Sequence, residues 1–186
     1  MDNIGDILYS IIEEIGKEKI QTDITFNVGL SVKYIDMIMD CCKKVLDLTN
    51  EENVGSLCEA LLHFMITTCT LPSARKVRLG KVNLDIVIPN LGVLRNFPQN
   101  AIIIQIVKNS QGMTEDQQKN ISTIQPNIKN IWAITKKPAS GNYVNYAAES
   151  RNNKITSFQR RNFHNIIVDI EAFLQKTNDK SFRFFH

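Results

Sequence analysis

A short, nearly continuous apolar run, Ala-Ile-Ile-Ile-Gln-Ile-Val at residues 101–107, constrains the fold of this chain more than any other feature. Its middle is rich in β-branched residues, which favour a strand over a helix. Continuous rather than alternating hydrophobicity is typical of a strand that is buried on both faces. The run contains Gln105 and is far too short to span a bilayer. We therefore expect it to be a central strand of the fold.

The segments around this strand carry helical and β patterns in a mixed order. Apolar residues at helical spacing predict helices at about 3–19, 31–47, 50–68, 114–124 and 162–177. Alternation and turn residues predict a hairpin or bent strand at 75–88, around Gly80, and another strand at 128–135. Residues 23–29 fit a short strand or an extended linker. Residues 90–100 and 136–161 are expected to be loops.

The order of these segments narrows the fold class. Three strands come before the crossover helix, whereas a doubly wound nucleotide-binding fold alternates strands and helices strictly. The sequence also lacks the GxxxxGK[ST] and GxGxxG motifs that bind phosphates. We therefore expect an α/β protein with a mixed α+β sheet.

The length and composition indicate one main domain with a small addition. A chain of 186 residues can bury a core without disulfides or metal, and 43% hydrophobic with 22% charged residues is typical of a soluble protein. We expect a helical extension at 1–48 and a core with a C-terminal helix at 49–186. The first residues are acidic, and no basic segment is followed by an apolar one. We expect no secretory signal, no membrane association and a cytoplasmic location.

The net charge of +3 hides an uneven distribution along the chain. Residues 1–60 hold 5 Lys or Arg against 12 Asp or Glu, a net charge of −7. Residues 61–186 hold 17 against 7, a net charge of +10. A basic body favours polyanions such as DNA or RNA. The alternative is that the acidic helices pack on the basic body or on a second copy of the chain.

The four cysteines are not arranged as a zinc site. None forms a Cys-x-x-Cys pair, and the three histidines are scattered along the chain. We expect small, buried thiols, and no nucleophile–base arrangement for acyl transfer is visible.

Three charged residues stand where phosphodiester chemistry could use them. Asp85 interrupts an otherwise apolar strand, where a carboxylate is costly unless it is paired, hydrogen-bonded or bound to metal. Lys108 ends the central strand, and Glu59 lies on the helix before the hairpin. Phosphodiester hydrolysis with Mg²⁺ uses converging carboxylates and a positive group that stabilises developing charge. The alternatives are an Asp85 paired with Lys76, Arg78 or Lys81, and a solvent-exposed Glu59 and Lys108.

Residues 50–135 resemble the PD-(D/E)xK restriction-endonuclease-like superfamily, which includes archaeal Holliday-junction resolvases. Gly55-x-x-x-Glu59-x-x-Leu62 is similar to the opening helix of resolvase-type members, Leu84-Asp85 takes the place of the Pro-Asp pair, and Lys108 takes the place of the triplet lysine. The resemblance implies an αβββαβ core. It also implies a Mg²⁺ or Mn²⁺ site at Asp85, supported by Glu59.

The triplet departs from the family pattern at one position. Ile106 stands two residues before Lys108, where the superfamily has an acid. Gln105 is one residue further away and points to the opposite face of a regular strand. A β-bulge near 106–107 would bring Gln105 and Lys108 to one side. Either Gln105 replaces the acid, or the site is degenerate and the fold binds without cutting.

Two groups of basic residues are candidates for nucleic-acid contacts. The first lies on the hairpin: Arg75, Lys76, Arg78 and Lys81. The second is interleaved with tyrosines, an arrangement that suits backbone contacts and base stacking: Lys136, Lys137, Arg151, Lys154, Arg160 and Arg161. No helix-turn-helix, zinc-finger or RNP motif is visible, so structure-directed binding is favoured over sequence readout.

The sequence leads to one main hypothesis and two alternatives. The main hypothesis is a Mg²⁺-dependent, nuclease-like protein that acts on DNA phosphodiesters through Asp85, Glu59, Gln105 and Lys108. The first alternative is a protein of the same fold that binds nucleic acid or acts as a scaffold without cutting. The second is a subunit of a protein assembly, with a homodimer as one form.

Overall fold

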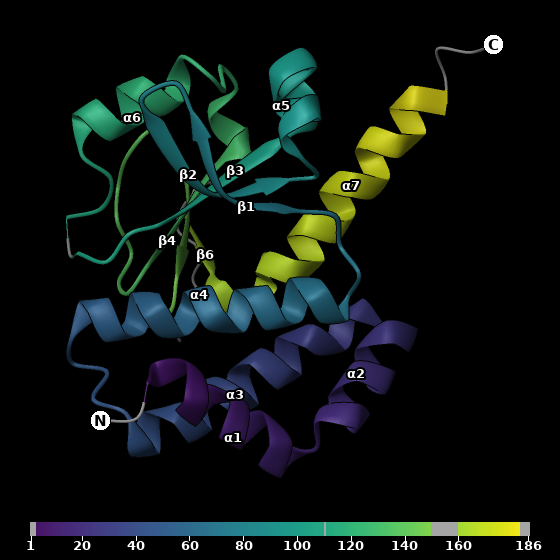
Figure 1. Cartoon of the computed structure of the whole chain (residues 1–186), viewed down its shortest axis with the longest axis vertical. Coiled ribbons are helices and arrows are strands. Elements are labelled where there is room, and N and C mark those ends of the chain that lie inside the picture. The colour runs from purple at the N-terminus through teal and green to yellow at the C-terminus, as the bar shows by residue number, and fades with distance from the viewer. Residues whose placement is uncertain (1–2, 110, 150–159, 183–186) are drawn as a thin grey trace.

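The apolar run forms β3, which lies inside a six-stranded sheet in this computed structural model (Figure 1). The structure describes residues 3–109, 111–149 and 160–182. The strands follow one another in the sheet in chain order: β1 (Ala74–Leu79), β2 (Val82–Ile88), β3 (Ile102–Ile106), β4 (Ile131–Thr135), β5 (Val144–Ala147) and β6 (Arg160–Asn162). β1, β2 and β3 pair antiparallel, and β3 to β6 pair parallel. The expected mixed sheet is confirmed.

Helices cover both faces of this sheet (Figure 1). One face packs in a first core against α1 (Ile4–Ile15), α2 (Lys17–Phe26), α3 (Ser31–Val45), α4 (Glu51–Thr68) and α7 (Ile166–Phe182). The other face packs in a second core against α5 (Leu91–Asn96) and α6 (Glu115–Ser122). Short 3-10 turns complete the described elements: η1 (Val28–Leu30), η2 (Pro98–Asn100), η3 (Ile128–Asn130) and η4 (Phe163–Asn165). Burial on both faces explains why β3 is apolar without alternation.

The expected αβββαβ order is present as α4, β1, β2, β3, α6 and β4. The strand or linker expected at 23–29 is wrong, because α2 runs to Phe26, Asn27 caps the next turn, and η1 begins at Val28. Ile20 and Ile24, one helical turn apart, are both fully buried, and Gly16 in the left-handed conformation separates α2 from α1.

Two segments expected to be loops also contain regular structure. Residues 90–100 form α5 and η2, because the Asn90 side chain accepts a hydrogen bond from the Val93 N–H and starts a short helix. The segment 136–161 contains β5 and the start of β6. All four residues of β5 are buried, so it carries neither the alternation nor the length that marks a strand in a sequence.

Helix α4 is the element on which the two parts of the chain meet. It lies between the sheet on one side and α1 to α3 on the other (Figure 1). The Asn50 side chain caps its start by accepting a hydrogen bond of 2.8 Å from the Glu52 N–H. Because α4 packs on two sides, its buried residues cover most of its circumference: Val54, Gly55, Leu57, Cys58, Leu61, Leu62, Phe64, Met65, Ile66 and Thr68.

The helices of residues 1–48 share the first core with the sheet. Ile12 of α1 and Ile38 of α3 belong to the same hydrophobic cluster as Ile104 of β3 and Ile134 of β4. The helices of residues 1–48 and the sheet therefore have a common core, and the division of the chain at residue 48 stays a prediction from the sequence. No helix in the described ranges combines the length and the apolar character that a membrane span needs.

Replacing Ile38 by Ala should lower the free energy of unfolding of the whole protein by about 2–5 kcal/mol, because its side chain is fully buried. Val45→Ala on the same helix is the matched control and should change it by no more than about 0.5 kcal/mol, since Val45 is 63% exposed. Urea denaturation followed by circular dichroism measures both. One shared transition is expected, and a separate early transition that alone shifts in Ile38→Ala would contradict a shared core.

Candidate active site

The candidate site lies at a point of the β1–β2 hairpin where the alternation of side chains between the two faces of the sheet is interrupted. Residues three apart in a regular strand point to opposite faces. Ala74 and Val77 of β1 nevertheless both pack in the second core, and so do Leu84 and Val87 of β2. The alternation therefore slips by one residue in each strand, while the register between the strands is the same on both sides of the slip.

Lys76 and Asp85 stand at the level of this slip. Lys76 has a φ of +49°, in the left-handed region that a residue with a side chain rarely adopts. Its Nζ lies 3.0 Å from Asp85 Oδ1. The expectation that Asp85 could pair with a neighbouring cation is therefore confirmed for Lys76.

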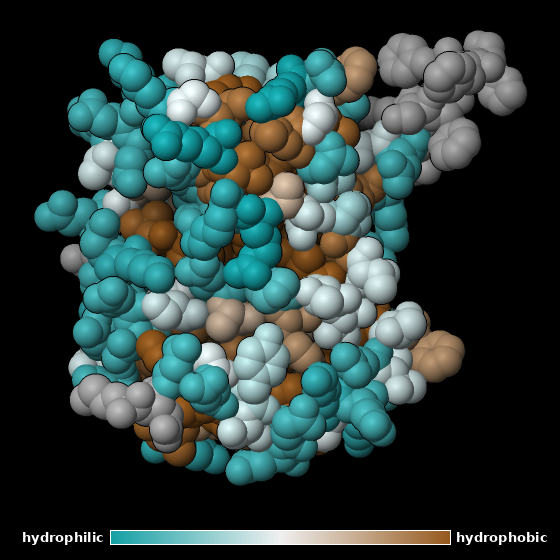
Figure 2. Space-filling view, in the orientation of Figure 1, coloured by the Kyte–Doolittle hydropathy of each residue, from teal (hydrophilic) through white to brown (hydrophobic). Residues whose placement is uncertain are grey.

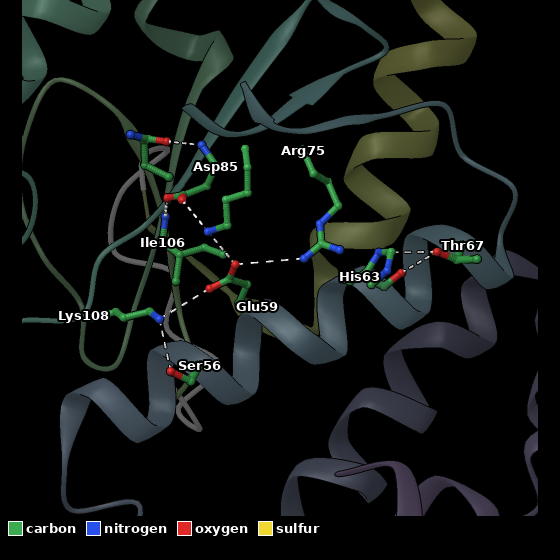
Figure 3. Close-up of polar contacts among 10 residues, drawn as sticks. Ser56, Glu59, His63, Thr67, Arg75, Asp85, Ile106 and Lys108 are labelled. Carbon is green, nitrogen blue, oxygen red and sulfur yellow. Dashed lines mark hydrogen bonds and ion pairs between the residues drawn. The ribbon is translucent and has the colours of Figure 1, made fainter. Parts of the chain in front are cut away.

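Glu59 of α4 completes this contact from the facing helix (Figure 3). Its Oε1 lies 2.6 Å from Lys76 Nζ and 4.0 Å from an Arg75 nitrogen, and its Oε2 lies 3.4 Å from Lys108 Nζ. One ammonium thus bridges two carboxylates from different elements. The Glu59 and Asp85 side chains are 16% and 25% exposed, whereas those of Lys76 and Lys108 are 59% and 39% exposed.

Lys108 reaches this group over the beginning of α4. Its Nζ donates a hydrogen bond of 3.1 Å to Ser56 Oγ (Figure 3). The helix passes so close that a Cβ added at Gly55 would lie 2.7 Å from Lys108 Cγ. Glycine at this position therefore makes room for the lysine, which gives a physical reason for the Gly55-x-x-x-Glu59 spacing.

The Gln105 side chain lies beside the charged residues, and its hydrogen bonds join it to the backbone of β2 rather than to Lys108. Its Oε1 accepts from the Asp85 N–H at 2.8 Å, and its Nε2 donates to the Asn83 carbonyl at 3.1 Å. The β2–β3 pairing ends at Ile86 and Ile104, so the Gln105 amide takes over backbone partners that the ladder no longer supplies.

The β-bulge that would bring Gln105 beside Lys108 is not present. β3 and β4 stay in one register from Ile103 to Ile106, and Val107 N–H continues the ladder by donating to the Ile134 carbonyl. The Ile106 N–H donates to Asp85 Oδ2 at 2.9 Å, so contacts with the backbone hold the side chains of both Asp85 and Gln105. The role of Gln105 as a replacement for the acid stays a prediction, and its observed contacts are with the backbone of β2.

The charges in the site shift one another's pKa values. Burial alone would raise the pKa of Glu59, but the hydrogen bond and charge of Lys76, followed by the charge of Lys108, lower it overall. Burial would lower the pKa of Lys76, but its hydrogen bonds and charge interactions with Glu59 and Asp85 raise it overall. Both groups are therefore held in their charged forms at neutral pH.

The hairpin group of basic residues lies beside the site. Arg75, Lys76, Arg78 and Lys81 are all exposed. Figure 2 shows strongly hydrophilic side chains over the region between β1 and α4. The Arg78 Nε donates to the Gly80 carbonyl at 3.2 Å, which holds the arginine near the turn. This surface could accept phosphates without rearrangement of the core.

The second basic group is less uniform than its sequence suggested. Lys136 is tied to the Thr49 carbonyl at 2.7 Å and to Glu149, and only 11% of its side chain is exposed. Arg161 pairs with Asp169 at 2.6 Å. Lys137 and Arg160 are exposed, although Arg160 also donates to Ser140 Oγ. Arg151 and Lys154 lie outside the described residues.

The sequence did not reveal that Lys76 would bind both carboxylates. A signal was available on α4, where five polar residues follow one line at spacings of three or four: Glu52, Ser56, Glu59, His63 and Thr67. On a helix that packs on two sides, a line of polar residues indicates the part of the surface that is left uncovered. His63 lies further along it, where the Thr67 hydroxyl donates to its carbonyl at 2.9 Å (Figure 3).

The donor set suits a hard divalent cation. Mg²⁺ is commonly held by one or two carboxylates together with water and substrate phosphates, and Glu59 and Asp85 present such a pair. Within residues 3–109, 111–149 and 160–182, no three His, Cys, Asp or Glu side chains are grouped in a way that could hold a metal ion. Among these described side chains, Glu59 and Asp85 are the pair that the site presents to a cation.

Comparisons with known proteins agree with the fold. No protein-family model matches the sequence, and a comparison with curated proteins finds no significant relative. Among solved structures, metal-depleted Ecl18kI in complex with uncleaved, modified DNA is similar with a TM-score of 0.61 and 12% identity, over 96% of this chain and 80% of that one. The complex of the restriction endonuclease PspGI with substrate DNA is similar with a TM-score of 0.57 and 12% identity, over 95% and 94%. The chain therefore has a restriction-endonuclease-like fold.

Replacing Glu59 by Gln should lower the free energy of unfolding at pH 7 by about 1–2 kcal/mol, because three cations lose their common anion. The pKa of Glu59 is lowered in the folded state, so its contribution is present above the unfolded value of about 4.3 and is lost as the pH falls through the folded value. The difference between wild type and Glu59→Gln should therefore shrink between pH 5 and pH 3.

Urea denaturation across this pH range measures that difference. Glu14→Gln, at an exposed position of α1, is the matched control and should have a much smaller effect at pH 7. A difference for Glu59→Gln that stays constant down to pH 3 would contradict the assignment.

Proposed function

We propose that this protein binds DNA and hydrolyses its phosphodiester bonds with the help of a divalent cation. The observation that carries the proposal is the convergence of Glu59, Asp85 and Lys108, from α4, β2 and the end of β3, beside an exposed basic hairpin. Structure-directed cutting of branched DNA, which the resemblance to resolvases implies, is part of the proposal.

The carboxylates of Asp85 and Glu59 are the residues that would hold Mg²⁺ or Mn²⁺. When bound there, the cation supplies a Lewis acid that neutralises charge on the phosphate and lowers the pKa of water. Asp85 is oriented for this role by the Ile106 and Gln105 contacts, which fix both its side chain and its backbone. Preorganisation of this kind avoids reorganisation during the reaction.

Lys108 would act on the reacting phosphate or on the attacking water. Its ammonium is partly exposed and is held by Glu59 and Ser56 rather than extending freely into solvent. A positioned cation at this distance from the carboxylates can stabilise the negative charge that develops on the phosphate oxygens.

DNA would be bound mainly through its backbone. The exposed residues Arg75, Arg78 and Lys81 lie on the same hairpin as Lys76 and Asp85, so phosphates held by the hairpin pass beside the carboxylates. The similar solved structures of Ecl18kI and PspGI are DNA complexes, which supports the choice of DNA over RNA. Lys137 and Arg160 are candidates for additional contacts.

A second candidate function is DNA binding without cleavage. The observation that favours it is the apolar Ile106 at the position where the superfamily has an acid, together with two carboxylates that are already paired with lysines. In this alternative the same basic surface holds DNA, and the charged group stabilises the junction between α4 and the hairpin.

Asp85→Ala should reduce metal-dependent cleavage of labelled duplex, branched or single-stranded DNA by at least about 100-fold, because it removes a carboxylate that would hold the cation. DNA affinity measured in EDTA should be retained or increased, since a negative charge is lost from a DNA-facing surface. Gel-based cleavage with Mg²⁺ or Mn²⁺ and fluorescence anisotropy measure the two effects.

Asp116→Ala, at an exposed position in the first turn of α6, is the matched control and should cut like wild type. Equal cleavage by wild type and Asp85→Ala would exclude Asp85 as the metal ligand. No cleavage by wild type, with salt-dependent binding intact, would favour the second candidate function.

Arg78→Ala should weaken DNA binding and reduce the slope of log Kd against log salt concentration by about 1, because one phosphate contact is lost. Lys33→Ala, at an exposed position of α3 within the acidic helices, should leave the slope unchanged. Identical slopes for the two variants, measured by anisotropy between low and moderate salt, would place the DNA away from the hairpin.

A further inference from the structure

Lys76 occupies the position in which a cation shared by Glu59 and Asp85 would lie. Its Nζ is 2.6 Å from one carboxylate and 3.0 Å from the other, so a single positive charge bridges oxygens from α4 and β2. This is the arrangement expected of a metal ion held by two carboxylates, with an ammonium in its place. The fold implies a divalent cation here, and the chain supplies its own monovalent one.

The backbone of Lys76 directs the side chain into this position. With a φ of +49°, the residue lies where the alternation of β1 slips, opposite the equivalent slip at Asp85. In a strand that kept its alternation, residue 76 would point to the same face as Ala74, which packs in the second core. The slip instead turns Lys76 toward α4 and Glu59.

The balance of charge makes the ammonium and a divalent cation competitors. Glu59 and Asp85 carry two negative charges, Lys76 brings one positive charge into contact with both, and Lys108 brings a second into contact with Glu59. A divalent ion entering beside Lys76 would be repelled by the ammonium at close range. It would also find the Glu59 and Asp85 oxygens already paired with that ammonium. If Lys76 leaves, Glu59 keeps its contacts with Lys108 and the more distant Arg75, and Asp85 loses the ammonium that now pairs with it.

We propose that Lys76 is an internal counter-ion that blocks the metal position, so that a divalent cation binds only when the Lys76 side chain moves out. Its side chain is 59% exposed, so it can leave without disturbing the core. The phosphate backbone of DNA is the anion that would receive it, because Lys76 belongs to the exposed basic hairpin. This last step rests on the proposed function, whereas the competition between Lys76 and the metal does not.

The test is the affinity of the isolated protein for Mn²⁺, measured without DNA by electron paramagnetic resonance of the free ion. Lys76→Met keeps the length and loses the charge, and it should bind Mn²⁺ at least about tenfold more tightly than wild type. Lys76→Arg keeps the charge and should remain as weak as wild type. Lys81→Met removes a neighbouring exposed charge of the same hairpin and should change the affinity by less than about threefold.

Two further variants locate the ion and guard against misfolding. Adding Asp85→Asn to Lys76→Met should abolish the gain, because one of the two carboxylates is lost. Lys76→Gly removes the side chain and suits the positive φ, so it should show the same gain as Lys76→Met in a protein with wild-type circular dichroism. If Lys76→Met fails to fold, the comparison is made with Lys76→Gly.

Unchanged or weaker Mn²⁺ binding in a folded Lys76→Met or Lys76→Gly protein would overturn the inference. A gain that survives Asp85→Asn would also overturn it, since the ion would then lie elsewhere. The cleavage assay is a separate result. Tighter Mn²⁺ binding without any DNA cleavage would retain the inference and reject the nuclease function, whereas cleavage by wild type with no gain in Lys76→Met would do the reverse.

Discussion

The burial of α4 on two sides is the constraint on which the rest of the structure depends. Its apolar residues pack against the sheet and against α1 to α3, so the helix cannot rotate or shift without opening the first core. Only a narrow polar stripe remains between these two contacts, and Glu59 lies on it. The carboxylate that meets the hairpin is therefore positioned by a hydrophobic contact along the whole helix rather than by its own ion pairs, which exposed charges alone would fix only loosely.

The site is the place where this packed frame meets an irregular sheet. Regular pairing ends between β2 and β3, and the side chains of Asp85 and Gln105 bind the backbone groups that become free. At the same level the two strands of the hairpin change face. The carboxylates and lysines thus gather where the pairing and alternation of the sheet are interrupted. Such interruptions are common in strands next to functional sites.

Much of the architecture could be predicted from the sequence because burial leaves clear patterns. The apolar run of β3, the hairpin around Gly80 and the capped start of α4 all follow from local composition. β5 could not be predicted, because four buried residues show no period, and α2 was missed since its two buried isoleucines stand among polar residues. The meeting of Glu59, Asp85 and Lys108 was expected from a short motif. The bridging by Lys76 was not, because it depends on a backbone conformation that no propensity favours.

The hydrogen bond from the Ile106 N–H to Asp85 has a consequence for how this site can change over evolution. Every residue except proline supplies that N–H, so the orientation of Asp85 does not depend on which side chain stands at position 106. The Ile106 side chain packs at the margin of the first core, on the strand face that leads to Lys108. An exchange of Ile106 for an acidic residue would therefore keep the N–H that orients Asp85.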